Sequence, residues 1–184
     1  MSLIRKPFVF MRHGETSANT QQIIAGVTDT PLNAEGIAQT TQVRAILARQ
    51  WSVIATSNLQ RTQQSAAHAI PHHPQLHLKG LAERNWGDLE GCAILDPMPY
   101  LETPNNGESW QEFTNRAIGA INYLLTHNEV PLIVAHSGIY RALCDEIQGT
   151  PYGARIANAT PYLFTPIQET DWNISIYKGK PNES

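Results

Sequence analysis

The stretch that decides the fold is Phe8-Val9-Phe10-Met11-Arg12-His13-Gly14-Glu15-Thr16, in which four apolar residues run directly into a polar turn. A short apolar run followed by a glycine predicts a buried strand. In open α/β sheets, ligands bind beyond the carboxyl ends of the strands, and Gly14 would let the backbone come close to one. The stretch therefore predicts a strand that ends on a phosphate-binding arginine, Arg12, and a nucleophilic histidine, His13.

Strand-length apolar runs alternate with longer helical patterns through most of the chain. The predicted strands are residues 8–11, 52–56, 76–78, 131–135, 159–165 and 173–177, and the predicted helices are 33–49, 59–70, 108–127 and 138–148. This alternation is typical of βαβ units on a parallel sheet. We expect Asn33 to cap the first helix and Gly149 to end the last. The prediction is one α/β domain over residues 1–184, a three-layer α/β/α sandwich with a mostly parallel central sheet.

Composition places the chain among ordinary globular proteins. Of its 184 residues, 41% are hydrophobic and 16% charged, and the net charge of −3 argues against a nucleic-acid partner. The amino terminus has no apolar signal-peptide core, and no apolar run is long enough to span a membrane. We therefore expect a soluble, cytoplasmic protein without a cofactor. Cys92 and Cys144 are expected to be reduced thiols without a catalytic task.

Further motifs follow the first in a fixed order. They are Asn19; Gly26, Asp29, Pro31 and Leu32; Ser57-Asn58-Leu59-Gln60-Arg61-Thr62; Glu83-Arg84-Asn85-Trp86-Gly87 with Glu90-Gly91; Gly107-Glu108-Ser109; and Ala135-His136-Ser137-Gly138. With these motifs the chain resembles the histidine phosphatase superfamily, which includes the phosphoglycerate mutases and many small phosphatases. Without the other motifs, we would interpret Arg61 as an arginine on a helix surface and His136 as a histidine of the core.

The resemblance implies a phosphoglycerate mutase-like fold in which Arg12, His13, Arg61, Glu83 and His136 share one pocket. It also implies that His13 is the nucleophile and becomes a transient phosphohistidine. Phosphoryl transfer mainly requires positioning and positive charge around the phosphoryl oxygens. Arg12, Arg61 and a charged His136 would supply that charge, and they would also lower the pKa of His13 and keep it neutral.

Glu83 is the candidate general acid. An alkoxide is a poor leaving group until it receives a proton, and a carboxyl group can deliver one and later activate water. Asn19 would donate from its amide, and the amides of Ser137 and Gly138, at a helix start, would favour an anion. The full set of expected phosphate or substrate contacts is Thr16, Asn19, Trp86, Ser137 and Gly138.

The segment after Glu83 separates a mutase from a phosphatase. From residue 85 to 108 there is no lysine or arginine, whereas Asp88, Glu90, Asp96, Glu102 and Glu108 are acidic. Such a lid would repel a phosphoglycerate. The mutase pattern after the second histidine is Gly-Asn, where this chain has Ser137-Gly138. We predict a phosphomonoester hydrolase; mutase-type transfer and a non-catalytic member that binds a phospho-ligand or a protein remain as alternatives.

The substrate is expected to be a small phosphomonoester. Trp86, Met98 and Tyr100 would form an apolar wall that suits a neutral group such as a nucleoside or a sugar. Trp86 could equally be a packing residue. Residues 92–106 read as a long loop, which in a compact domain is usually functional or mobile. The α-ribazole-phosphate phosphatases are one branch with such a substrate, but the sequence does not select it.

A cluster of histidines, His68, His72, His73 and His77, raises the question of a metal site. Pro71 and Pro74 interrupt any helix there, and no carboxylate or cysteine accompanies the set. We interpret these residues as exposed loop histidines and expect no metal. A homodimer is left open.

Overall fold

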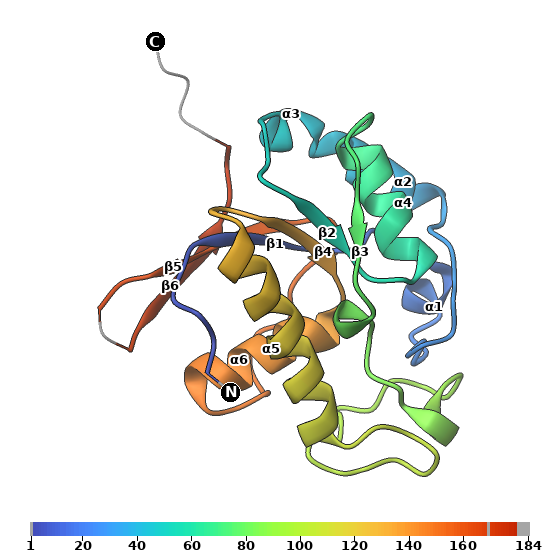
Figure 1. The fold of residues 1–184 in the computed structure, drawn as a ribbon. Helices are drawn as coiled ribbons and strands as arrows, with labels where there is room; N and C mark the ends of the chain where they lie inside the picture. The colour runs from blue at the N-terminus through green and yellow to red at the C-terminus, as the bar shows by residue number, and fades with distance from the viewer. Residues whose placement is uncertain (1, 169, 180–184) are drawn as a thin grey trace.

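The central sheet contains strands from both halves of the chain (Figure 1). The computed structural model describes residues 2–168 and 170–179, so residues 1, 169 and 180–184 of the expected domain 1–184 lie outside the described residues. Within the described part the sheet has six strands in the order β3-β2-β4-β1-β5-β6. They are β1 (Phe8–Arg12), β2 (Ile54–Thr56), β3 (Leu76–His77), β4 (Leu132–Ala135), β5 (Pro161–Pro166) and β6 (Trp172–Ile176).

Strand directions match the expected sheet. The β1–β4, β2–β4 and β2–β3 pairs are parallel, whereas β5 runs antiparallel to both β1 and β6. Only β5 is therefore reversed among the described strands, and the mostly parallel sheet is confirmed.

Helices cover both faces of the sheet, which gives three layers (Figure 1). The α-helices are α1 (Ser17–Thr20), α2 (Ala34–Gln42), α3 (Arg44–Leu47), α4 (Gln60–Ala69), α5 (Trp110–His127) and α6 (Ser137–Gln148), with short 3₁₀ turns η1 (Lys79–Leu81) and η2 (Gly87–Leu89). α2, α3 and α4 lie on one face, and α5 and α6 on the other. No helix in the described residues is both long and apolar enough to cross a membrane.

Successive side chains of β1 point alternately into two hydrophobic cores, one on each face of the sheet. Phe8 and Phe10 belong to the cluster beneath α5 and α6, whereas Val9 and Met11 belong to the cluster beneath α2, α3 and α4. All four side chains are completely buried. Because successive strand residues point to opposite faces, a strand covered on both sides must be apolar throughout. The apolar run of residues 8–11 therefore belongs to a central strand of the sheet.

The predicted helix 33–49 is wrong in its continuity, because it breaks at Val43 into α2 and α3. The hydroxyls of Thr40 and Thr41 donate to the carbonyls of Gly36 and Ile37, both at 2.8 Å. Such bonds compete with the helical backbone ladder. The expected helix ends are confirmed: the Asn33 side chain accepts the Gly36 N–H at 2.8 Å, and Gly149 ends α6 in the left-handed region at φ 74°.

Candidate active site

Strand register brings His13 and His136 together. β1 and β4 are parallel neighbours in which Arg12 lies opposite Ala135. The next residue of each strand is a histidine, so both rings leave the sheet at the same level. Their ring centroids are 5.3 Å apart, and the His13 amide donates to the Ala135 carbonyl at 3.0 Å. The two histidines are thus close enough to contact one phosphoryl group, as predicted.

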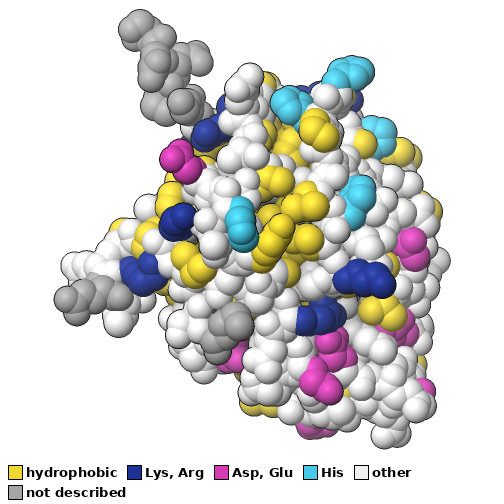
Figure 2. Space-filling view, viewed as in Figure 1, with side chains coloured by type: hydrophobic (Ala, Val, Ile, Leu, Met, Phe, Trp, Pro, Cys, Tyr) yellow, Lys and Arg dark blue, Asp and Glu magenta, His cyan; other side chains and the backbone are white. Residues whose placement is uncertain are grey.

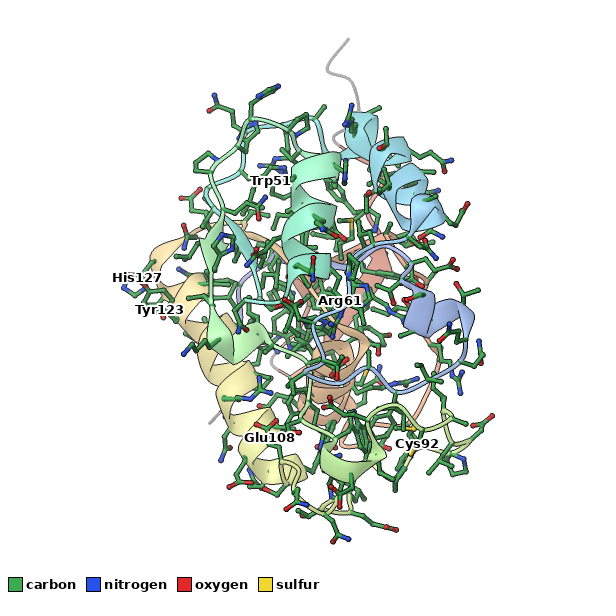
Figure 3. The ribbon with its side chains drawn as sticks, turned by 90° about the vertical axis from the view of Figure 1, so that its right-hand side faces the viewer. Trp51, Arg61, Cys92, Glu108, Tyr123 and His127 are labelled. Carbon is green, nitrogen blue, oxygen red and sulfur yellow. The ribbon has the colours of Figure 1, made fainter. Side chains whose placement is uncertain are left out.

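The two site arginines are held by backbone carbonyls. Arg61, in the first turn of α4, donates to the Thr28 and Gly26 carbonyls at 2.9 and 2.7 Å, and Arg12 donates to the Ile156 carbonyl at 3.1 Å. Figure 3 shows Arg61 among the interior side chains below α4. Within the described part of the chain, the buried Nε atoms of Arg12 and Arg61 have no hydrogen-bond partner. Fixed, buried and unpaired N–H groups of cations suit an anion.

A cavity of about 380 Å³ opens beside these groups. Nine of the ten sequence-predicted site residues line it: Arg12, His13, Thr16, Asn19, Arg61, Glu83, Trp86, Ser137 and Gly138. The tenth, His136, is completely buried behind the cavity wall and lies against His13. The structure therefore groups all ten residues at the carboxyl ends of β1, β2 and β4, where the ligands of α/β sheets bind.

The tautomer of His13 follows from its partner. His13 Nδ1 lies 2.7 Å from the Gly14 carbonyl oxygen, which can only accept. Nδ1 must carry the proton, and a neutral ring then has its lone pair on Nε2. Gly14 allows this turn, because a Cβ there would lie 2.6 Å from the Gly36 carbonyl oxygen. The His13 ring is thus prepared for nucleophilic attack through Nε2.

The pKa values of both histidines lie well below the usual 6.5, first because burial penalises the charged ring and then because of Arg61. Arg12 lowers both pKa values further, and the Gly14 hydrogen bond only partly opposes the effect at His13. A neutral His13 was expected. The expected cationic His136 is wrong for the unliganded site, because a buried ring beside two arginines favours the neutral form.

Acidification below pH 6.5 should destabilise the fold through these histidines. Their pKa values are about 6.5 in the unfolded chain and lower in the folded one, so the unfolded chain binds more protons in that window. Full stability is present above pH 6.5 and is lost as the pH falls toward the folded-state pKa, by at most about 1.4 kcal/mol per pH unit per histidine. Denaturant unfolding should show a shallower pH slope for His136→Asn than for the wild type. Equal slopes in the two proteins would contradict the prediction.

The Glu83 carboxylate is held by two backbone amides. Oε1 accepts from the Arg84 N–H at 2.8 Å, and Oε2 accepts from the Gly138 N–H at 3.0 Å. The Gly138 amide, which we expected to contact the anion directly, therefore binds the candidate acid instead. A Cβ at position 138 would overlap the Glu83 carboxylate. Glycine is required here by this close approach, and the second-histidine motif thereby orients Glu83.

Gly138→Ala should displace the Glu83 carboxylate and reproduce the loss of Glu83 itself. We expect kcat/KM to fall at least tenfold more for an alkyl phosphate than for p-nitrophenyl phosphate, whose leaving group needs no proton. Gly119→Ala in α5 is the matched control, because a Cβ there meets nothing within 4 Å. Steady-state kinetics on both substrates provide the measurement. Equal losses on the two substrates would show that position 138 does not act through Glu83.

Thr16 and Asn19 form a small unit at the start of α1. The Asn19 side-chain oxygen accepts from the Thr16 amide at 3.1 Å and from its hydroxyl at 3.2 Å. This leaves the Asn19 NH₂ group as the donor that can reach the cavity. The expected neutral donor is therefore in place, and Thr16 orients it.

Trp86 is both a wall of the cavity and a packing residue. Its ring lies 5.9 Å from the Tyr100 ring, and Arg84 stacks on it at 4.4 Å. Arg84 also donates to the carbonyls of Tyr100 and Glu102 at 2.8 and 2.7 Å. The buried Arg84 side chain thus attaches the 92–106 loop to the site, and Met98 and Tyr100 of that loop line the cavity as expected.

The expected acidic lid is not placed as predicted. Of its five carboxylates only Asp96 lines the cavity. Glu108 pairs with Arg116 at 2.6 Å, and Glu90 accepts the Val27 and Trp86 amides at 2.9 and 3.1 Å. The Glu90 and Glu108 carboxylates therefore hold neighbouring segments of the chain in place. The five acidic residues do not form a lid over the cavity that would repel an anionic substrate.

Sequence analysis missed two cations in the cavity wall, Arg141 and Arg155. Arg141 is buried in α6 and donates to the Gly153 carbonyl at 2.9 Å. Arg155 follows α6 and lies 3.7 Å from Asp96, with both side chains exposed. Arg141 could have been found from its place one helical turn after Gly138. Nothing in the sequence around Arg155 indicates a site.

The histidines outside the site are spread over the surface. On the face of the molecule shown in Figure 2, the histidine side chains are scattered around an apolar patch and do not gather at one point. His77 Nδ1 lies 2.7 Å from the Thr56 hydroxyl. In the described residues, no three His, Cys, Asp or Glu side chains are grouped so that they could hold a metal ion. Cys92 and Cys144 are free thiols, as expected.

The fold, the histidine pair and the arginine-lined cavity together suit the binding of a phosphoryl group. Residues 8–174 match the histidine phosphatase superfamily (branch 1), and the chain belongs to this family. The resemblance based on the motifs is therefore confirmed.

Among similar proteins, the uncharacterized phosphatase PhoE of Bacillus subtilis is 35% identical over 91% of each chain. The metal-independent phosphoserine phosphatase of Arabidopsis thaliana is 27% identical over 83% of this chain and 73% of its own length. The alpha-ribazole phosphatase structure from Shigella flexneri superposes with a TM-score of 0.77 at 24% identity, covering 94% of this chain and 96% of that one. This last likeness concerns the fold alone.

Proposed function

We propose that the protein hydrolyses small organic phosphomonoesters through a phosphohistidine on His13, without a metal. The observation that carries this proposal is the pairing of a neutral His13, with its lone pair on Nε2, and the buried, unpaired Nε–H groups of Arg12 and Arg61 beside one cavity. A nucleophile next to preorganised cationic donors is what phosphoryl transfer requires.

In the first step, Nε2 of His13 attacks phosphorus and the P–O bond to the alcohol breaks. Glu83 gives its proton to the departing oxygen, so the product leaves as a neutral alcohol. In the second step, water attacks the phosphohistidine while the Glu83 carboxylate takes one of its protons. Phosphate leaves, and His13 and Glu83 return to their starting states. The Gly14 carbonyl holds the Nδ1 proton throughout.

The lining of the cavity supports an organic leaving group. Trp86, Met98 and Tyr100 line the cavity and can face the organic part of a substrate. The charged lining residues are the cations Arg12, Arg61, Arg141 and Arg155 and the carboxylates Glu83 and Asp96, of which Glu83 must be protonated to act as the acid. This excess of cations suits a phosphoryl dianion. The preference for a phosphatase over mutase-type transfer is supported by the relatives described as phosphatases.

Metal independence is supported by the cations themselves. Arg12 and Arg61 occupy the role that Mg²⁺ has in many phosphotransferases, which is to neutralise charge on the phosphoryl oxygens. The Arabidopsis relative described as a metal-independent phosphoserine phosphatase is consistent with this role. A non-catalytic member that binds a phospho-ligand or a protein is the weaker alternative. All five candidate catalytic residues are present and grouped at the cavity: Arg12, His13, Arg61, Glu83 and His136.

Phosphate release from a panel of phosphomonoesters, with and without excess EDTA, tests the proposal. We expect turnover of at least some esters of uncharged alcohols, slower turnover of phosphoglycerate, and no effect of EDTA. Loss of activity with EDTA that a divalent ion restores would contradict the metal-independent mechanism. Binding of phosphate without release from any ester would favour the non-catalytic alternative.

A further inference from the structure

The backbone amides of residues 13–16, in the turn after β1, are each bound by a different element. Their acceptors are, in order, Ala135 of β4, Ser65 of α4, Gln39 of α2 and Asn19 of α1, at 3.0, 2.9, 3.0 and 3.1 Å. A buried amide without an acceptor is costly, so these bonds fix the conformation of the turn. The turn thus presents His13 in a conformation that is set by the surrounding elements.

Ser65 binds this turn and also the backbone of a site arginine. Its hydroxyl oxygen lies 2.9 Å from the Gly14 nitrogen and 2.6 Å from the carbonyl oxygen of Arg61, one turn earlier in α4. A carbonyl can only accept a hydrogen bond, and an amide N–H can only donate one. The hydroxyl proton of Ser65 is therefore donated to Arg61, and a lone pair accepts from Gly14. Ser65 is completely buried, so bulk water does not compete for these bonds.

Gly14 is held on both sides of its Cα atom. Its N–H donates to Ser65, and its carbonyl oxygen accepts from Nδ1 of His13 at 2.7 Å. Glycine has no side chain that restricts rotation about its backbone bonds, so the direction of this carbonyl depends on bonds from other residues.

Removing the Ser65 hydroxyl would leave the buried Gly14 N–H without its acceptor. The backbone would then rotate to find another partner, because an unsatisfied buried amide costs about 1 to 3 kcal/mol. Rotation at Gly14 also turns its carbonyl away from Nδ1 of His13. The proton on Nδ1 would lose the acceptor that keeps it there, and the ring would lose its fixed orientation.

We propose that Ser65 is a positioning residue, which holds the Gly14 carbonyl against Nδ1 of His13 and fixes the nucleophile relative to Arg61. The term nucleophile rests on the proposed function. Ser65 is not among the described residues that line the cavity, so it acts through its neighbours. Attack requires a well-aligned nucleophile, and a displacement of about 1 Å can cost about a hundredfold in rate.

Nitrogen-15 NMR of histidine-labelled protein tests this positioning directly. At neutral pH, with His13→Asn used to assign the signals, we expect the wild-type His13 ring to be protonated on Nδ1 alone. Ser65→Ala should give a mixture of the two neutral tautomers, because Nδ1 loses its fixed acceptor. Thr126→Ala in α5 is the matched control and should keep the wild-type signals. The Thr126 hydroxyl also donates to the carbonyl four residues earlier, at 2.8 Å, but on an exposed part of that helix.

Kinetics supply the second readout. Ser65→Ala should lower kcat/KM by about ten- to a hundredfold, and equally for an alkyl phosphate and p-nitrophenyl phosphate, because both need the same attack by His13. Thr126→Ala should keep the wild-type kcat/KM on both substrates. If Ser65→Ala does not fold, Ser65→Cys supplies the same comparison with smaller effects, since sulfur is only a weak acceptor.

Two results would overturn the inference. One is a Ser65→Ala protein in which His13 stays protonated on Nδ1 alone, whatever its kinetics. The other is an active Ser65→Ala enzyme with an unchanged kcat/KM. The NMR measurement needs no turnover. A His13 tautomer that depends on Ser65, in a protein that hydrolyses no ester, would contradict the proposed function and leave the positioning role of Ser65 intact.

Discussion

Replacing His13 by asparagine should abolish turnover of every phosphomonoester, with a fall in kcat/KM of about 10⁴- to 10⁶-fold, because removing the nucleophile removes the covalent route. Asparagine keeps an N–H that can donate to the Gly14 carbonyl and so preserves the local turn. The loss should be similar for alkyl phosphates and p-nitrophenyl phosphate, since both need the same attack on phosphorus. Steady-state phosphate release on both substrates provides the measurement.

The matched control is His127→Asn, on the exposed surface near the end of α5, where Figure 3 labels it beside Tyr123. Its kinetics should equal those of the wild type. Rapid quenching after mixing with a phosphorus-32 substrate should label the wild type and not His13→Asn, and the label should be stable to base and labile to acid, as a phosphoramidate is. An active His13→Asn, or a label on another residue, would contradict the phosphohistidine mechanism.

Glu83→Gln should harm substrates according to how much their leaving group needs a proton. General acid catalysis typically contributes about 10²- to 10⁴-fold, so kcat/KM for an alkyl phosphate should fall by that factor. A nitrophenolate leaves as a stabilised anion, so the loss for p-nitrophenyl phosphate should be at least tenfold smaller. Glutamine is nearly the same size and keeps an oxygen for one of the two backbone amides. The exposed Glu35→Gln is the control and should retain wild-type kinetics.

The comparison must use kcat/KM, which reports steps up to the first irreversible one. If water attack on the phosphohistidine limits kcat, the loss of the base role of Glu83 slows both substrates alike. A tenfold or larger gap in kcat/KM shared by Glu83→Gln and Gly138→Ala would link the backbone amide of Gly138 to the acid. Equal losses on both substrates would mean that Glu83 is not the acid; Glu15 would be examined next, since Glu108 is paired with Arg116.

The sequence alone determined the elements whose causes are local. The apolar run of β1 indicated a buried strand, Asn33 and Gly149 marked helix ends, and the order of motifs indicated the family and the ten site residues. These signals depend on side-chain periodicity and on contacts within a few positions of the chain. The break of the first long helix at Val43 was also local, but the competing hydroxyl bonds of Thr40 and Thr41 were overlooked.

Only the tertiary structure decided contacts between residues far apart. Glu83 meets the Gly138 amide across 55 positions, and Ser57 meets His136 across 79. Strand order and register fix these distances, and the sequence does not state either. The same packing places the Glu90 carboxylate against the Val27 amide and the Glu108 carboxylate against Arg116. It also places Arg155 in the cavity wall. Burial, a property of the assembled fold, lowered the pKa of His136 and made it neutral, because desolvation penalises the charged ring.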